Sequence, residues 1–149
     1  MIKNTKNTLI TIVGPTAIGK TALSILLANH FKSDIISCDS RQFYKEMTIG
    51  TAVPEKEELA AAKHHFIQNR SIFEDYNVGE FERDTLKKLD NLFTENPVQI
   101  MVGGSGLYVD AVLKGLDYFP EVDPKIREEL TTELHEKGIE VLQEKLKEL

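Results

Sequence analysis

The chain has 149 residues and a formal net charge of −6, with 41% hydrophobic and 28% charged residues. This composition is ordinary for a globular chain in water, and the length suits one domain or slightly more. The acidic balance argues against broad, nonspecific binding to nucleic acid but leaves room for a local basic surface. No apolar stretch approaches the roughly 20 residues of a membrane span, and the single cysteine, Cys38, excludes an intrachain disulfide. We therefore expect a cytoplasmic protein with no targeting segment and no membrane contact.

A glycine-bounded loop follows the first predicted strand. Residues 9–13 are apolar and mostly β-branched, which is typical of a strand buried on both faces. The loop fits the pattern G-x-x-x-x-G-K-[ST], and residues 22–31 are apolar at helical spacing, Leu23 and Leu26 included. We expect backbone N–H groups to hold a di- or triphosphate, while Lys20 adds positive charge and the Thr21 hydroxyl holds Mg²⁺. The predicted diphosphate-binding residues are Gly14, Pro15, Thr16, Ala17, Ile18, Gly19, Lys20 and Thr21.

Two further buried strands are predicted at residues 35–38 and 98–102. We expect all three strands to be parallel, with 98–102 beside 9–13. Loops that leave the carboxyl ends of parallel strands gather at one edge, where ligands bind. Asp39, after the second strand, is the only acid in these loops. Its carboxylate could hold Mg²⁺ through water, act as a general base or cap a helix, and Ser105 is its expected hydrogen-bond partner.

The remaining elements are predicted to be mostly helical. We expect Cys38 to be a small, buried hydrophobic residue. His64 and His65 are adjacent and cannot converge on one metal ion, so we expect one packed and one exposed histidine. Capping residues and breakers mark the helix ends. Asn77 is the expected cap of a helix that runs to about residue 95, and Glu80 supports this cap. The other predicted helices cover residues 55–62, 107–113 before Gly115, 124–137 after Asp123, and 139–149 after Gly138.

Several segments together resemble the tRNA dimethylallyltransferase (tRNA isopentenyltransferase) family. They are GPTAIGKT (14–21), ISCDSRQFYKEMTIGTAVP (36–54), HHFI (64–67), YNVGEF (76–81) and VGGSGLYVDAVLKGL (102–116). The resemblance implies a P-loop NTPase-like α/β fold, a parallel sheet flanked by helices with the start of a helical insertion. It also implies transfer of a dimethylallyl group from dimethylallyl diphosphate to N6 of the adenine beside the anticodon of tRNA.

The resemblance also implies roles for individual residues. The phosphate loop would hold the diphosphate of the prenyl donor rather than ATP, and Asp39 would be the base on the adenine amine. Recognition of a flipped-out nucleotide suits this chemistry, because a reacting base must leave its stack. The implied tRNA contacts are Asp39, Ser40, Arg41, Gln42, Ser105 and Arg127.

Some features depart from the family pattern. Ile18 stands where a small residue is common, and Val53 replaces a usual lysine. Family chains also run well past this one, so we expect an incomplete core over residues 1–118 and the start of a helical, tRNA-covering insertion over 119–149. We expect little or no transferase activity from this chain alone, and a monomer.

Two other hypotheses about the function remain open. A small-molecule kinase of the shikimate or nucleoside type also carries a phosphate loop and an acid after its second strand, but it transfers phosphate from ATP. A truncated domain that binds diphosphate without further activity is the non-enzymatic alternative. Dependence on a prenyl diphosphate, rather than on ATP, distinguishes a dimethylallyltransferase from the kinase.

Overall fold

The computed structural model describes residues 6–117 and 122–149. The chain divides into two compact units, residues 1–116 and residues 117–149. The expected boundary at residue 118 lies outside the described residues. The expected division at residue 118 and the assignment of the second unit to a tRNA-covering insertion stay predictions.

The larger unit is built on a parallel sheet in the order β1-β4-β2-β3. Strand β1 (Thr8–Val13) pairs along its length with β4 (Val98–Gly103), and β4 pairs on its other side with β2 (Ile35–Ser37). The three predicted strands, their parallel direction and the pairing of the first with the third are confirmed. Strand β3 (His64–His65) pairs in parallel with β2 and was not predicted. Two residues are too few to show strand periodicity.

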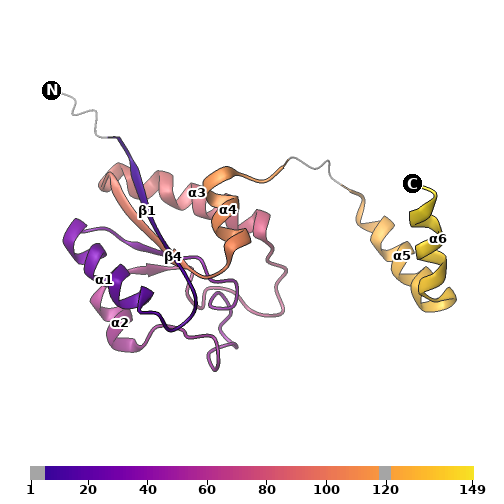
Figure 1. Ribbon diagram of the computed structural model, residues 1–149, viewed down its shortest axis with the longest axis horizontal. Helices are drawn as coiled ribbons and strands as arrows, with labels where there is room; N and C mark the ends of the chain where they lie inside the picture. The colour runs from indigo at the N-terminus through magenta and orange to yellow at the C-terminus, as the bar shows by residue number, and fades with distance from the viewer. Residues whose placement is uncertain (1–5, 118–121) are drawn as a thin grey trace. The chain divides into compact units, whose positions relative to one another are not determined.

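Helices cover both faces of this sheet (Figure 1): α1 (Lys20–Phe31) and α2 (Lys56–Ala61) on one, α3 (Val78–Glu95) and α4 (Gly106–Lys114) on the other. Neighbouring strand residues point to opposite faces. Ile35 and Ile100 therefore pack with Ala28 of α1, whereas Ile36 and Met101 pack with the apolar residues of α3 and α4. All four of these strand side chains are fully buried. The expected α/β sheet flanked by helices is confirmed.

Two of the large apolar residues of helix α1 lie outside its buried face. Leu23 and Leu26 are 46% and 68% exposed, whereas Ser24 and Ala28 are buried. Ser24 satisfies its hydroxyl by donating to the Thr21 carbonyl oxygen at 2.8 Å. Ile25 and Leu27 are partly buried and pack against the same cluster as Ala28, so the face that α1 turns to the sheet combines small and large residues.

The segment between β2 and α2 is irregular but anchored. Phe43 is fully buried and stacks on Phe81 of α3, with ring centroids 5.0 Å apart. The Phe43 carbonyl accepts a hydrogen bond from the Arg70 N–H at 2.9 Å. Asn77 caps helix α3 as predicted, and its side chain accepts from the Glu80 N–H in a capping box. Helix α2 spans one residue less at each end than predicted.

The smaller unit contains α5 (Pro124–Lys137) and α6 (Ile139–Lys147). As predicted, Asp123 caps α5 by accepting from the Lys125 N–H at 3.0 Å, and Gly138, at a φ of 82°, separates the helices. Glu133 of α5 pairs with Lys137 at 3.1 Å and with Lys145 of α6. Within residues 6–117 and 122–149, every helix is too short or too polar to cross a lipid bilayer.

Candidate functional site

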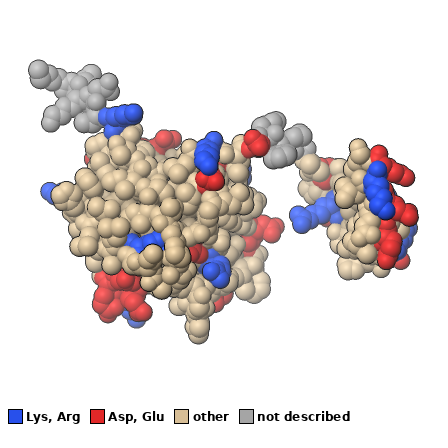
Figure 2. All heavy atoms as spheres, in the orientation of Figure 1, with Lys and Arg blue, Asp and Glu red and all other residues tan. Residues whose placement is uncertain are grey.

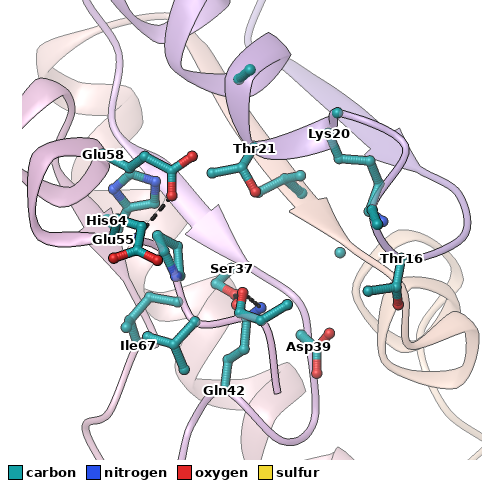
Figure 3. Close-up of a pocket in the computed structure, with 18 residues that line it drawn as sticks. Thr16, Lys20, Thr21, Ser37, Asp39, Gln42, Glu55, Glu58, His64 and Ile67 are labelled. Carbon is teal, nitrogen blue, oxygen red and sulfur yellow. Dashed lines mark hydrogen bonds between the residues drawn. The ribbon is translucent and has the colours of Figure 1, made fainter. Parts of the chain in front are cut away.

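A cavity of about 420 Å³ opens at the carboxyl ends of β1, β2 and β4. Figure 3 shows Thr16 and Lys20 of the phosphate loop on one side, Glu55, Glu58 and His64 on the other, and Asp39 at the rim between them. Residues from three predicted loops do meet here. The lining comprises Thr16, Ala17, Gly19, Lys20, Thr21, Ala22, Ser37, Asp39, Gln42, Ala52, Val53, Pro54, Glu55, Glu58, His64, Ile67, Val102 and Gly103.

The phosphate loop joins β1 to α1. Gly19 adopts a left-handed conformation, with a φ of 95°, and precedes the first helical residue without offering a capping side chain. The helix N-terminus, which favours anions, therefore starts at the cavity. Lys20 Nζ donates to the Pro15 carbonyl oxygen at 2.6 Å. Gly14, Pro15 and Ile18 shape the loop but do not line the cavity, and the Ile18 side chain is 66% exposed.

Asp39 sits in a tight turn after β2. Its Oδ1 accepts from the Arg41 N–H at 3.1 Å, and its carbonyl oxygen accepts from the Gln42 N–H at 3.1 Å. No helix begins between residues 39 and 55, so helix capping, one of the three roles considered for Asp39, is wrong. The carboxylate lines the cavity together with Lys20 and Thr21. Base and metal-holding roles both remain compatible with this position.

Ser105 does not orient Asp39 as expected. Its Oγ accepts from the Ser40 N–H at 3.0 Å and lies 3.2 Å from the Ser40 hydroxyl oxygen. The loop after β4 therefore holds the loop after β2 through Ser40, while the Arg41 N–H fixes the Asp39 carboxylate. The two serines and Arg41 lie beside the cavity rather than in its lining.

Cys38 precedes Asp39 and is fully buried. Burial and the nearby Asp39 carboxylate raise the pKa of its thiol to about 12. The thiol is therefore protonated and unreactive at neutral pH. This confirms the prediction of a small buried hydrophobe.

The wall that faces the phosphate loop was missed by the sequence reasoning. It consists of residues 52–55, Glu58, His64 and Ile67. Glu58 caps α2, since its Oε2 accepts from the Glu55 N–H at 2.8 Å. Val53, which departs from the family pattern, also lines the cavity. The only sequence signals were the GTAVP and HHFI segments, which have no helical or strand periodicity.

The two histidines have separate partners. His64 Nδ1 lies 2.8 Å from the Ala62 carbonyl oxygen, so Nδ1 carries the proton and Nε2 the lone pair. Burial lowers the pKa of His64. His65 Nε2 lies 2.7 Å from Asp34 Oδ2. Both histidines are half-buried, so the expectation of one packed and one exposed residue is wrong.

Charge is unevenly distributed around the cavity. Acidic atoms gather over the α2 end of the larger unit (Figure 2), where Glu55, Glu57 and Glu58 lie. Lys20 supplies a positive charge from the phosphate loop. A ligand with a phosphate group is therefore attracted to the loop side of the cavity, away from these acids.

Gln42 and Arg127, the remaining residues predicted to contact tRNA, lie in different units of the chain. Gln42 lines the cavity, but its amide is bonded to protein groups. Arg127 lies on α5 in the smaller unit, where it is exposed. Their contacts with tRNA stay predictions.

Comparison with known proteins gives consistent matches. The sequence model of the IPP transferase family matches residues 42–149. The tRNA dimethylallyltransferase of Flavobacterium johnsoniae is 67% identical over 141 residues, which cover 95% of this chain and 46% of that protein. The same enzyme from Christiangramia forsetii is 62% identical over 140 residues, covering 94% and 46%. The chain thus spans about half the length of the curated relatives it matches.

Solved structures agree with these matches. The full-length tRNA isopentenylpyrophosphate transferase of Bacillus halodurans gives a TM-score of 0.73 at 35% identity, over 96% of this chain and 48% of that one. A eukaryotic dimethylallyltransferase acting on tRNA gives a TM-score of 0.72 at 25% identity, over 89% and 33%. The larger unit therefore has the P-loop NTPase-like fold that the sequence predicts.

Proposed function

The chain belongs to the IPP transferase family, and on this premise we propose that it supplies the diphosphate-binding and proton-accepting part of a tRNA dimethylallyltransferase. The observation that carries the proposal is the shared cavity of Lys20 and Asp39. A cation for a leaving diphosphate and a carboxylate for a nucleophile's proton are the two groups that prenyl transfer to an amine requires. The names of the relatives support the choice of tRNA and dimethylallyl diphosphate as substrates.

In the proposed reaction, the N6 nitrogen of adenine attacks the dimethylallyl carbon bonded to the diphosphate oxygen. The new N–C bond forms as the C–O bond breaks, and the diphosphate leaves with the bonding electron pair. Asp39 accepts the N6 proton, which keeps the electron pair on nitrogen available for the new bond. Lys20 and the N–H groups of the phosphate loop stabilise the charge that grows on the diphosphate.

Mg²⁺ is proposed as the accompanying ion. Thr21 offers a hard oxygen donor at the cavity, which suits this cation. Among the described residues, no cluster of three or more His, Cys, Asp or Glu side chains could hold a metal by itself. This fits an ion held by Thr21 and by the phosphates of a ligand rather than by a protein cage. Bound there, Mg²⁺ would neutralise charge on the leaving diphosphate.

The tRNA side of the site is proposed around Asp39. Ser40, Arg41 and Ser105 lie beside the cavity and would contact the flipped-out adenine and its neighbours, because unpaired bases are recognised by side chains such as Arg. Arg127 would contact the tRNA from the second unit. We also propose that the enzyme is a cytoplasmic monomer.

A label-transfer assay tests the proposal. The chain, and a chimaera that continues it with the C-terminal half of the Flavobacterium johnsoniae relative, are incubated with labelled dimethylallyl diphosphate and unmodified tRNA. We expect the chimaera to label tRNA at an adenine beside the anticodon. Parallel reactions contain γ-labelled ATP and small hydroxyl acceptors. Phosphate transfer from ATP without prenyl transfer would instead favour the kinase.

A further inference from the structure

The side-chain amide of Gln42 links two segments of the cavity wall. Its Nε2 donates to the carbonyl oxygens of Ala52 at 2.8 Å and Thr51 at 3.2 Å, and its Oε1 accepts from the Ser37 hydroxyl at 3.0 Å. Carbonyl oxygens only accept hydrogen bonds, so the nitrogen must face them and the oxygen must face Ser37. Both amide hydrogens are therefore used within the protein.

The backbone of Gln42 is also fixed. Its N–H donates to the Asp39 carbonyl oxygen at 3.1 Å, and its carbonyl accepts from the Gln68 N–H at 2.8 Å. The next residue, Phe43, is fully buried against α3. The backbone of Gln42 is thus fixed at the core. Its side chain extends from there to residues 51 and 52.

The segment that Gln42 holds forms no helix or strand between residues 50 and 55. Thr51 is buried, and Ala52 has a φ of 52°, a left-handed conformation that alanine rarely adopts. Such a conformation persists only where surrounding contacts enforce it. The residues after it, Val53, Pro54 and Glu55, form the cavity wall that faces the phosphate loop.

We propose that Gln42 is a positioning residue that holds the carbonyl groups of Thr51 and Ala52 beside the end of β2 and so sets the wall opposite the phosphate loop. Its amide acts on the fit of the diphosphate ligand rather than by contacting RNA. The identity of that ligand as dimethylallyl diphosphate rests on the proposed function. To bind a nucleotide through Nε2, Gln42 would first have to release residues 51 and 52.

The test compares Gln42→Glu with Gln68→Glu. The first variant keeps the side-chain length and the acceptor for Ser37 but loses both donors and sets a carboxylate against two carbonyls. The second makes the same change in charge at a glutamine outside the cavity lining, whose Nε2 donates to Thr48 Oγ1 at 2.8 Å. Hydrogen exchange is measured on a peptide covering residues 49–55, with an α3 peptide as the internal reference.

We expect exchange of the 49–55 peptide to accelerate about tenfold or more in Gln42→Glu, as the loss of two hydrogen bonds implies. The α3 peptide and Gln68→Glu should remain unchanged. Calorimetry should show weaker binding of dimethylallyl diphosphate and of inorganic pyrophosphate to Gln42→Glu. The salt dependence of tRNA binding should stay that of the parent chain.

Unchanged exchange in Gln42→Glu, or a loss of tRNA affinity with unchanged pyrophosphate affinity, would overturn the proposal. If Gln42→Glu does not fold, Ser37→Ala takes its place, because it removes the bond that orients the Gln42 amide. A smaller acceleration at 49–55 is then expected, and none would overturn the proposal. A parent chain that binds no dimethylallyl diphosphate contradicts the proposed function alone, since the exchange comparison needs no ligand.

Discussion

The backbone of Gly103 lies directly against the carbonyl group of Cys38, so closely that an added Cβ would overlap the carbonyl oxygen and carbon. This contact joins the end of β4 to the residue before Asp39. It sits beneath the cavity, which Gly103 and Asp39 both line. A residue with any side chain at this position would push the loop after β2 and the loop after β4 apart.

Gly103→Ala should therefore destabilise the fold by roughly 1–3 kcal/mol, the usual cost of overpacking a site that is already filled. Urea unfolding followed by circular dichroism measures it. Gly106→Ala is the matched control, because a Cβ there meets nothing within 4 Å. Equal stability of the two alanine variants would contradict the close approach of Gly103 to Cys38.

His64 predicts a pH dependence of stability. Burial lowers its folded-state pKa below the ordinary value of 6.5, so the unfolded chain takes up a proton before the folded one does. The contribution of His64 is complete above pH 6.5 and is lost as the pH falls through the folded-state pKa. The unfolding free energy should therefore decline as the pH drops below 6.5.

His64→Asn isolates this effect. Asparagine can still donate to the Ala62 carbonyl oxygen through its side-chain nitrogen, but it does not titrate. The variant should lose part of the decline, whereas His135→Asn, at an exposed site on α5, should retain all of it. Denaturant midpoints between pH 5 and 8 give the comparison. Identical slopes in the parent chain and His64→Asn would refute the role of His64.

Much of the fold could be predicted because its signals are local. The apolar runs of β1, β2 and β4, the phosphate-loop pattern and the caps at Asn77 and Asp123 each act within a few residues. The cavity wall that faces the phosphate loop could not be predicted, because residues 52–55 owe their position to Gln42 and to packing rather than to their own periodicity. His64 joins the site through a strand of two residues, and Ser105 meets Ser40 by the geometry of two loops.

Asp39→Asn tests the general base. The variant keeps an oxygen that can accept from the Arg41 N–H but removes the basicity. In the chimaera, the rate of prenyl transfer should fall by roughly 10²–10⁴-fold, the usual contribution of a general base. Affinity for dimethylallyl diphosphate should change little across a Mg²⁺ titration. A marked rise in the Mg²⁺ concentration needed for donor binding would instead assign Asp39 to the metal.

Whether the phosphate loop holds the prenyl donor is tested by a calorimetric titration of dimethylallyl diphosphate, with Mg²⁺, into the parent chain and Lys20→Ala. The Lys20 ammonium bonds to the exposed Pro15 carbonyl rather than to core groups, so the variant should keep its unfolding free energy within about 0.5 kcal/mol. We expect a roughly 10- to 100-fold loss of donor affinity, the size of a charge-assisted hydrogen bond. Equal affinity in both proteins, or no binding to the parent chain, would contradict the claim that this loop holds the diphosphate of the prenyl donor.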